Sequence, residues 1–525
     1  MKTLIIGLDG GTWDVFAPLC DLGEMPNLAK LRAGGAWGVL KAPQPPTVAA
    51  SWATMATGVN PGRHGLLTRH AAGADRIAGL GYGAPAITGA DVHAPMLWQY
   101  FHAHDLTTGT INVPLSYPLR PGHGFAISGM FTPPRARNWL TPADLKNKLQ
   151  DYVIDLDYGR AWQDGQDADN LPPLPVIMDD ILHMTERRGM HILRLMRDLD
   201  WDVFTAVFTG TERIFRYFWH YLHAEDEDIA RNLDGAIADK LYTFFDLLDQ
   251  VLGAMVKMAG KDTRILLFSS YGYGPAARYQ ANLNNWLLEL DLLRLKPSGA
   301  SIEEIISTAA LPMTDPAKRI LNPEARKAVQ RYGSLAEAID RHATQAWAVP
   351  LDANIAGITL NRTSFSPPGP VHPDAAKRLL ASITEQALSL CIPGRNEPLV
   401  TDILPREKLF HGPYVEQFPD IILTLHPDYA AAAQLGSTLL TPIHPARRWH
   451  SGQRRREGML LASGPYIRRG QRIHPASLLD LAPTLLYLAN TPIPESMEGQ
   501  VITGIFTPDY PISHPPVTGP DLPTS

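Results

Sequence analysis

Short apolar runs of strand length recur along the chain between longer amphipathic segments. The first, TLIIGL at residues 3–8, is followed by Asp-Gly-Gly, which is typical of a buried strand that ends in a turn. Comparable runs predict strands at 107–114, 201–210, 263–272, 355–361, 420–425 and 458–464. Helical patterns lie between several of them, at 174–199, 224–259 and 372–391. Strands alternating with amphipathic helices predict an α/β fold with a largely parallel sheet covered on both faces.

Two segments break this rhythm. Residues 286–346 are polar and helix-rich, with Pro and Gly punctuation, and predict an inserted helical subdomain. From about residue 508 the chain is too rich in Pro and polar residues to pack, so we expect an extended or disordered tail. The predicted organisation is one domain over 1–507 with a helical insertion at about 286–346, and a disordered Pro-rich tail at 508–525.

The amino-acid composition argues against several classes of function. The chain has 525 residues, 45% of them hydrophobic and 19% charged, which is typical of a globular protein with a substantial core. A net charge of -6 gives no electrostatic reason to expect nucleic acid as a partner. Cys20 and Cys391 are too few for a disulfide framework, and the sequence has no signal-peptide pattern and no membrane span. We therefore expect a cytoplasmic protein.

Candidate chemistry follows from the position of the strand ends. In open α/β sheets, functional residues gather just beyond the carboxyl ends of the strands. This rule selects Asp9, residues 209–212, residues 269–271 and the loops at 44–58 and 447–458.

Several motifs in these segments occur together and in one order. They include GLDGGTWDVF at 7–16, SWATMATGVNPGRHG at 51–65, FTGTERIFRYFW at 208–219, FSSYGYGP at 268–275 and REGMLLASGPYIRRG at 456–470. With these motifs the chain resembles the type I phosphodiesterase/nucleotide pyrophosphatase branch of the alkaline phosphatase superfamily, from about residue 1 to 507. The resemblance implies an alkaline-phosphatase-like three-layer sandwich with a mostly parallel central sheet.

The resemblance also implies a site with two divalent metals, usually zinc, and a threonine or serine nucleophile. The metals polarise phosphoryl oxygens and lower the pKa of the nucleophile. Among the seven family positions, Asp9 is unchanged. The others read Val48 for the nucleophile (with Thr47 beside it), Glu212 for an Asp, Arg216 for a His, Ser270 and Tyr271 for an Asp-His pair, and Arg454 for the last His.

These replacements remove the chemistry that the family uses. Valine has no nucleophilic atom, and arginine stays protonated and repels a dication. Asp9 and Glu212 are the only family positions that retain a metal-ligating group. We therefore expect a non-catalytic family member without metal or another cofactor, in a binding or scaffold role. Its partner would be a phosphate- or carboxylate-bearing small molecule at an arginine-lined remnant pocket, or another protein.

Two alternatives stay open. The chain could be an active phosphodiesterase or phosphatase that holds zinc or another divalent metal pair with an unusual ligand set. A relocated site would draw on histidines at other positions, namely His64, His70, His220, His223, His444 and His450, and Thr47 could be a shifted nucleophile. The chain could also be a structural subunit that acts through a protein interface.

The sequence also predicts the partners of Arg216 and Arg454. Because family metal ligands converge in space, we expect Arg216 and Arg454 to point into the former metal site and to pair with Asp9 and Glu212. In a weaker form, Arg216 bonds Glu212 along its helix and Arg454 pairs with Asp9.

Overall fold

The computed structural model describes residues 1–68, 87–120, 122–156, 172–223, 233–296, 335–365, 367–432, 435, 438–443, 451–510, 514 and 516–523. The chain forms two compact units. Unit 1 comprises Met1–Arg69, Ala86–Pro275 and Trp449–Ser525, and unit 2 comprises His70–Pro85 and Ala276–Arg448.

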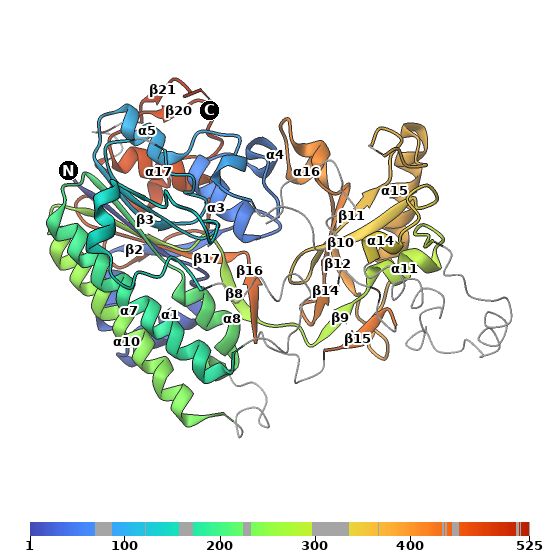
Figure 1. Cartoon of the computed structure of the whole chain (residues 1–525), viewed down its shortest axis with the longest axis horizontal. Helices are drawn as coiled ribbons and strands as arrows, with labels where there is room; N and C mark the ends of the chain where they lie inside the picture. Colours follow the sequence, from blue (N-terminus) through green and yellow to red (C-terminus); the bar gives the residue numbers. More distant parts are fainter. Residues whose placement is uncertain are drawn as a thin grey trace. The chain divides into compact units, whose positions relative to one another are not determined.

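A mostly parallel sheet forms the centre of unit 1 (Figure 1). Its middle strand, β1 (Thr3–Leu8), is buried at every residue and pairs in parallel with β6 (Val203–Phe208) and β7 (Arg264–Phe268). The strand order is β18-β2-β17-β7-β1-β6-β3-β4-β5, with β19 beside β2. The other strands are β2 (Ala36–Lys41), β3 (Thr108–Val113), β4 (Gly124–Ser128), β5 (Leu140–Thr141), β17 (Glu457–Ser463), β18 (Gln471–Arg472) and β19 (Ala476–Ser477). The predicted α/β fold is confirmed.

Helices cover both faces of this sheet, as Figure 1 shows. On one face lie α1 (Trp13–Leu22), α2 (Pro26–Ala33), α7 (Leu174–Asp198), α8 (Gly210–Leu222) and α10 (Gly235–Ala259). On the other lie α3 (Val48–Thr57), α4 (Pro61–His64), α5 (Leu97–Ala103) and α17 (Leu481–Leu488). The longest helices follow the expected 3.6-residue period, since α10 buries Leu241, Phe244, Leu248 and Leu252 against its neighbours.

Unit 2 has its own core. A four-stranded antiparallel sheet has the order β10-β11-β13-β12. Its strands are β10 (Ala346–Asp352), β11 (Ile355–Leu360), β12 (Val400–Pro405) and β13 (Ile421–Leu425), and they share a hydrophobic core with α15 (Pro373–Leu388). A smaller sheet joins β9 (Tyr279–Ala281), β14 (Tyr429–Ala431) and β15 (Leu440–Pro442). The predicted strands at 355–361 and 420–425 are therefore present, but in this antiparallel sheet.

The domain boundaries stay a prediction. Most of the expected insertion at 286–346 lies outside the described residues, which show α11 (Leu283–Glu289) at its start and α14 (Leu335–Ala338) near its end. The tail expected to be disordered contributes a fully buried Tyr510, and its strand β21 (Thr518–Gly519) pairs with β20 (Ile493–Pro494). Within the described part of the chain, no helix is long and apolar enough to cross a membrane.

Candidate functional site at the strand ends

The parallel strands β1, β6 and β7 end at the same edge of the sheet, and the first site residues follow their carboxyl ends. Leu8, the last residue of β1, pairs with Phe208 of β6, and Gly7 pairs with Phe268 of β7. Asp9 therefore emerges between the segment that enters α8 and the segment that contains Ser270 and Tyr271. The sequence-predicted positions on these three strands do converge.

Asp9 is fully buried and held by groups other than arginine. Its Oδ1 accepts a hydrogen bond from Trp52 Nε1 at 3.0 Å. Its backbone oxygen accepts from Thr211 Oγ1 at 2.6 Å, which links the turn after β1 to the first turn of α8. Asp9 Oδ2 is buried without a hydrogen-bond partner among the described residues.

Glu212, in the first turn of α8, is the centre of a buried ion cluster. Its Oε1 accepts from Arg216 Nε at 2.8 Å, from Arg216 Nη2 and from Tyr273 Oη at 2.6 Å. Its Oε2 accepts from Arg213 Nη1, and Arg213 Nη2 also contacts Asp155 Oδ2 at 2.7 Å. Both carboxylate oxygens of Glu212 are thus satisfied by charged or hydroxyl donors.

Arg454 joins the same cluster from a different element. It lies on β16 (Gly452–Arg455), opposite Tyr273 on the antiparallel partner β8 (Gly272–Pro275). Its Nη1 is 3.7 Å from Glu212 Oε1, and its guanidinium carbon is 5.9 Å from the ring centroid of Tyr271.

The expected pairing of the arginines was therefore wrong in one respect. Arg216 and Arg454 both contact Glu212, whereas Asp9 is bound by the indole of Trp52. The physical reason is distance: Glu212 and Arg216 are one helical turn apart, so two nitrogens of the Arg216 guanidinium donate to the same oxygen of Glu212. The weaker form of the expectation is thus confirmed for the bond between Arg216 and Glu212 along the helix, but not for the pairing of Arg454 with Asp9.

The pKa values of the two carboxyl groups, Asp9 and Glu212, are shifted in opposite directions. Burial raises the pKa of Asp9 to about 7, and the nearby charge of Glu212 raises it as well. Burial would also raise the pKa of Glu212, but the charges of Arg213 and Arg216 outweigh it and hold that pKa well below the usual range. The same ion pairs raise the pKa of Arg216 despite its burial.

The position that the sequence resemblance assigns to the nucleophile has no reactive group. Val48 is the first residue of α3, one turn before Trp52 on the same helix face. The neighbouring Thr47 hydroxyl caps α3, because it accepts from Ala50 N at 3.1 Å and donates to Leu67 O at 2.5 Å. Thr47 therefore has a structural role in the helix start.

Ser270 and Tyr271, at the Asp-His positions, are both fully buried. Ser270 Oγ and Tyr271 Oη have no hydrogen-bond partner among the described residues. Asp9 Oδ2 is a third such atom on this side of the site, and the Tyr271 hydroxyl is close enough to Asp9 to lower the pKa of its carboxyl group. Buried polar groups are usually paired, so this side is suited to a ligand or an ordered water.

The residues present do not fit the two-zinc centre that the resemblance implies. The described residues contain no group of three or more His, Cys, Asp or Glu side chains placed to hold a metal ion. Glu212 is enclosed by guanidiniums, whose positive charge opposes a dication. His64, a candidate for a relocated site, is buried with Nε2 3.1 Å from Thr54 Oγ1, and burial lowers its pKa to about 3. Of the other candidates, His70, His444 and His450 lie outside the described residues.

Sequence reasoning missed three members of the cluster: Arg213, Tyr273 and Asp155. Tyr273 could have been found, because it lies two residues after Tyr271 in an extended segment and so shares its side. Arg213 is adjacent to Glu212, but adjacent helix residues do not normally face each other. Nothing in the sequence near Asp155 marks it as a partner of α8.

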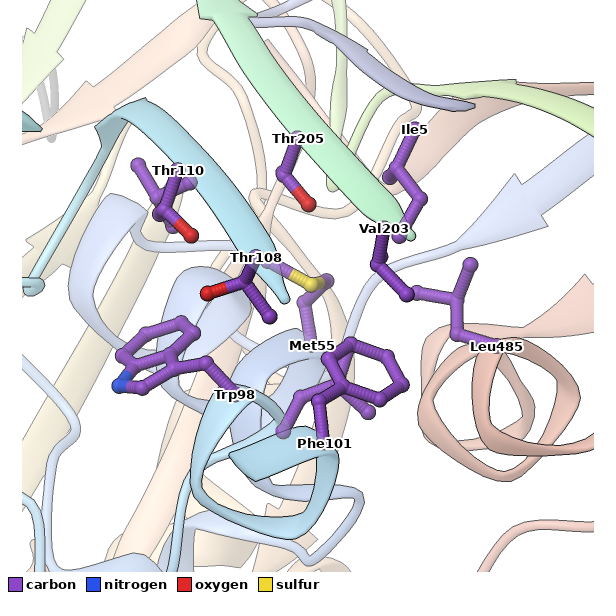
Figure 2. A pocket seen from close by; sticks show the side chains of 11 residues that line it. Ile5, Met55, Trp98, Phe101, Thr108, Thr110, Val203, Thr205 and Leu485 are labelled. Atoms are coloured by element: carbon purple, nitrogen blue, oxygen red, sulfur yellow. The ribbon is translucent and has the colours of Figure 1, made fainter. Parts of the chain in front are cut away.

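A separate small pocket lies between the sheet and α5 (Figure 2). Thr108 and Val203, which begin β3 and β6, line it together with Trp98 and Phe101 of α5. Figure 2 shows the hydroxyls of Thr108, Thr110 and Thr205 among apolar side chains. None of its lining residues is ionisable and none belongs to the candidate site, so this pocket offers no acid, base or metal ligand.

Comparisons with known proteins agree with the geometry of the fold. The structure of phosphonoacetate hydrolase from Sinorhizobium meliloti 1021, in complex with phosphonoacetate, is similar with a TM-score of 0.50 and 14% identity, over 94% of this chain and 95% of that chain. Murine ectonucleotide pyrophosphatase/phosphodiesterase 5 gives a TM-score of 0.48 and 10% identity, over 97% and 100% of the two chains. At these identities the likeness concerns the fold alone. A search of curated proteins found no match.

The family assignment rests on the sequence. The sequence model of one family matches residues 3–453, which include every site position discussed above except Arg454. By that match this chain belongs to the type I phosphodiesterase/nucleotide pyrophosphatase family.

Proposed function

We propose that this protein is a non-catalytic member of its family, a pseudoenzyme that binds an anionic ligand at the arginine-lined remnant of the metal site. The single observation that carries the proposal is the state of Glu212. This carboxylate, at a family ligand position, is bound by Arg213 and Arg216 and approached by Arg454. Positive charge therefore already surrounds the carboxylate that a metal ion would have to use.

The loss of catalysis follows from what the family reaction requires. The family is normally zinc dependent, and its members hydrolyse phosphoric esters. That chemistry needs an activated nucleophile and positive charge that stabilises the transition state. Val48 supplies no nucleophile, and the guanidiniums near Glu212 are engaged by carboxylates. A lone hydroxyl such as Thr47, already bonded to Leu67 O, would also lack activation.

Charge and hydrogen-bonding capacity support an anion as the ligand. Arg213, Arg216 and Arg454 carry three positive charges against the two carboxylates of Glu212 and Asp155. Asp9 adds less than a full negative charge near neutral pH, because its pKa is raised to about 7. The unpartnered hydroxyls of Ser270 and Tyr271 are donors, and a phosphate or carboxylate group would satisfy them.

The first experiment separates this proposal from the active alternative. Purified protein is analysed for bound metals and assayed with chromogenic phosphodiester and phosphomonoester substrates, with and without added zinc. We expect substoichiometric metal and no turnover above the blank. Near-equimolar zinc with hydrolysis that a chelator abolishes would refute the non-catalytic assignment and favour an unusual ligand set.

The second experiment tests the ligand. Inorganic phosphate and phosphonoacetate are titrated calorimetrically at constant ionic strength, with chloride as the reference anion. We expect saturable binding that Tyr271→Phe weakens, because the variant keeps the ring and removes only the unpartnered hydroxyl. If wild type shows no saturable binding, the anion site is wrong and the scaffold role through a protein interface becomes the better explanation. We also propose a cytoplasmic location, which cell fractionation tests.

A further inference from the structure

The end of the chain is bound to a segment that lies close to it in unit 1. Strand β21 runs parallel to β20, and Ile493 N donates to Val517 O at 2.8 Å. Further along, Ser496 N donates to Asp521 Oδ1 at 3.0 Å. Within the described residues β20 has no other strand partner. The tail residues 517–523 thus supply backbone and carboxylate acceptors for two amides of the segment 493–498.

That segment in turn holds the corner between α3 and α4. Glu498 N donates to Gly58 O at 3.0 Å, and both Glu498 carboxylate oxygens accept from Asn60 Nδ2 at 3.0 Å. Arg63 Nη1 donates to Ser496 O at 2.8 Å. The contact is close: Gly58 has a φ of +69°, and a Cβ there would lie 3.0 Å from Met497 Cγ.

The corner fixes α3 at two points. His64 Nε2 lies 3.1 Å from Thr54 Oγ1 near the end of the helix. Leu67 O accepts from the Thr47 hydroxyl that caps its start. Since α3 carries Trp52, whose indole binds Asp9, the corner sets one wall of the candidate site.

We infer that residues 517–523 form an intramolecular clasp, which holds the α3–α4 corner through the segment 493–498 and thereby positions Trp52 at Asp9. The clasp can release independently of the rest of the tail, because Tyr510 is anchored separately. Its ring stacks on Phe506 and His514, with ring centroids 4.8 and 4.5 Å apart, and Arg264 lies 4.9 Å above it.

The physical basis is local stability. A corner built from short loops opens at a free energy set by the few bonds that close it, whereas helices packed in the core open only with the whole unit. Removing the clasp leaves the amides of Ile493 and Ser496 without these acceptors. A protein or protease that engages the tail would therefore loosen the wall of the site without unfolding unit 1. This inference does not depend on anion binding or on the absence of catalysis.

Hydrogen–deuterium exchange measured by mass spectrometry tests the clasp. One truncated variant ends at Pro516 and so lacks the clasp. The matched control ends at Pro523 and lacks only the last two residues. We expect exchange of peptides covering 47–67 to be faster by about tenfold or more in the first variant and unchanged in the control. Peptides from α10 serve as the internal reference and should not change.

A point variant tests the same contact in a chain of full length, in case the truncated chain misfolds. Asp521→Ala removes one acceptor and keeps β21, so we expect a smaller acceleration, about threefold or more, over the same peptides. Unchanged exchange at 47–67 in both variants would overturn the clasp. Equal acceleration in α10 would also overturn it, because the tail would then stabilise the whole unit and not the corner.

Discussion

Removing Arg216 should destabilise the protein far more than removing Arg454, although both contact Glu212. Arg216 donates from Nε and Nη2 to Glu212 Oε1, and its side chain is only 10% exposed beside a carboxylate that is fully buried. Breaking a buried ion pair costs about 3–5 kcal/mol, since the remaining charge stays buried. Arg213 and Tyr273 still serve Glu212, so we expect Arg216→Ala to lose about 3 kcal/mol, the lower end of this range.

Arg454→Ala should cost less than Arg216→Ala, about 2 kcal/mol or less. Its Nη1 is 3.7 Å from Glu212 Oε1, beyond hydrogen-bonding distance, and its side chain is 17% exposed. Arg216→Lys should fall between the two variants, because an ammonium keeps the charge but cannot reproduce the guanidinium fork. The matched control is Arg194→Ala on α7, whose side chain is 46% exposed and pairs with Asp198 at 3.6 Å. We expect no measurable change there.

The assay is urea unfolding followed by circular dichroism and tryptophan fluorescence, with each variant compared with wild type in the transition that reports on unit 1. A loss of about 3 kcal/mol corresponds to more than a hundredfold change in the unfolding equilibrium, so the ranking is easily resolved. If Arg216→Ala behaves like Arg194→Ala, the cluster contributes nothing to folding and our account of Glu212 is wrong. An Arg454→Ala loss larger than that of Arg216→Ala would equally contradict it.

Three further predictions use other parts of unit 1. The pKa of Asp9 is about 7 in the folded state and about 4 in the unfolded chain, so between these values the folded state keeps a proton that the unfolded chain releases. Wild type should therefore lose stability relative to Asp9→Asn as pH rises from about 4 to 7, by up to about 4 kcal/mol. Unfolding curves taken at each pH measure this loss. The carboxylate of Asp249 accepts from Asn27 N at 2.9 Å and Leu28 N at 2.8 Å at the start of α2, so Asp249→Ala should cost about 2 kcal/mol in the same assay, and an unchanged midpoint would contradict this capping role. Val48→Thr should give no metal-dependent hydrolysis, because a restored hydroxyl still lacks metals to stabilise the transition state; measurable turnover would show that the site has been misinterpreted.

The sequence predicted the fold well because burial and pattern agree along the central strands. β1 is apolar and buried at all six positions, and its neighbours β6 and β7 are of the same kind. Residues at the carboxyl ends of such strands must share an edge, so Asp9 and Ser270 could be brought together from pattern alone. The antiparallel sheet of unit 2 was not predicted, because a short strand has the same pattern in either orientation.

Side-chain partners could not be predicted in the same way. Trp52 binds Asp9 from α3, and Asp155 binds Arg213 from a segment 58 residues away in the sequence. Such contacts depend on rotamers and on the packing of loops, which periodicity does not encode. Both arginines therefore contact Glu212, as expected, but the expected contact with Asp9 is made by Trp52.

The structure separates the remnant site into two halves with different physical states. Around Glu212, every carboxylate oxygen has a charged or hydroxyl donor, so this half gains little from any added ligand. Around Asp9, one carboxyl oxygen and the hydroxyls of Ser270 and Tyr271 are buried without partners among the described residues. A ligand gains most free energy where buried polar groups are unpaired, so an anion that binds here should contact Tyr271 and Ser270. The three arginines then attract it through their positive charge and keep their bonds to Glu212.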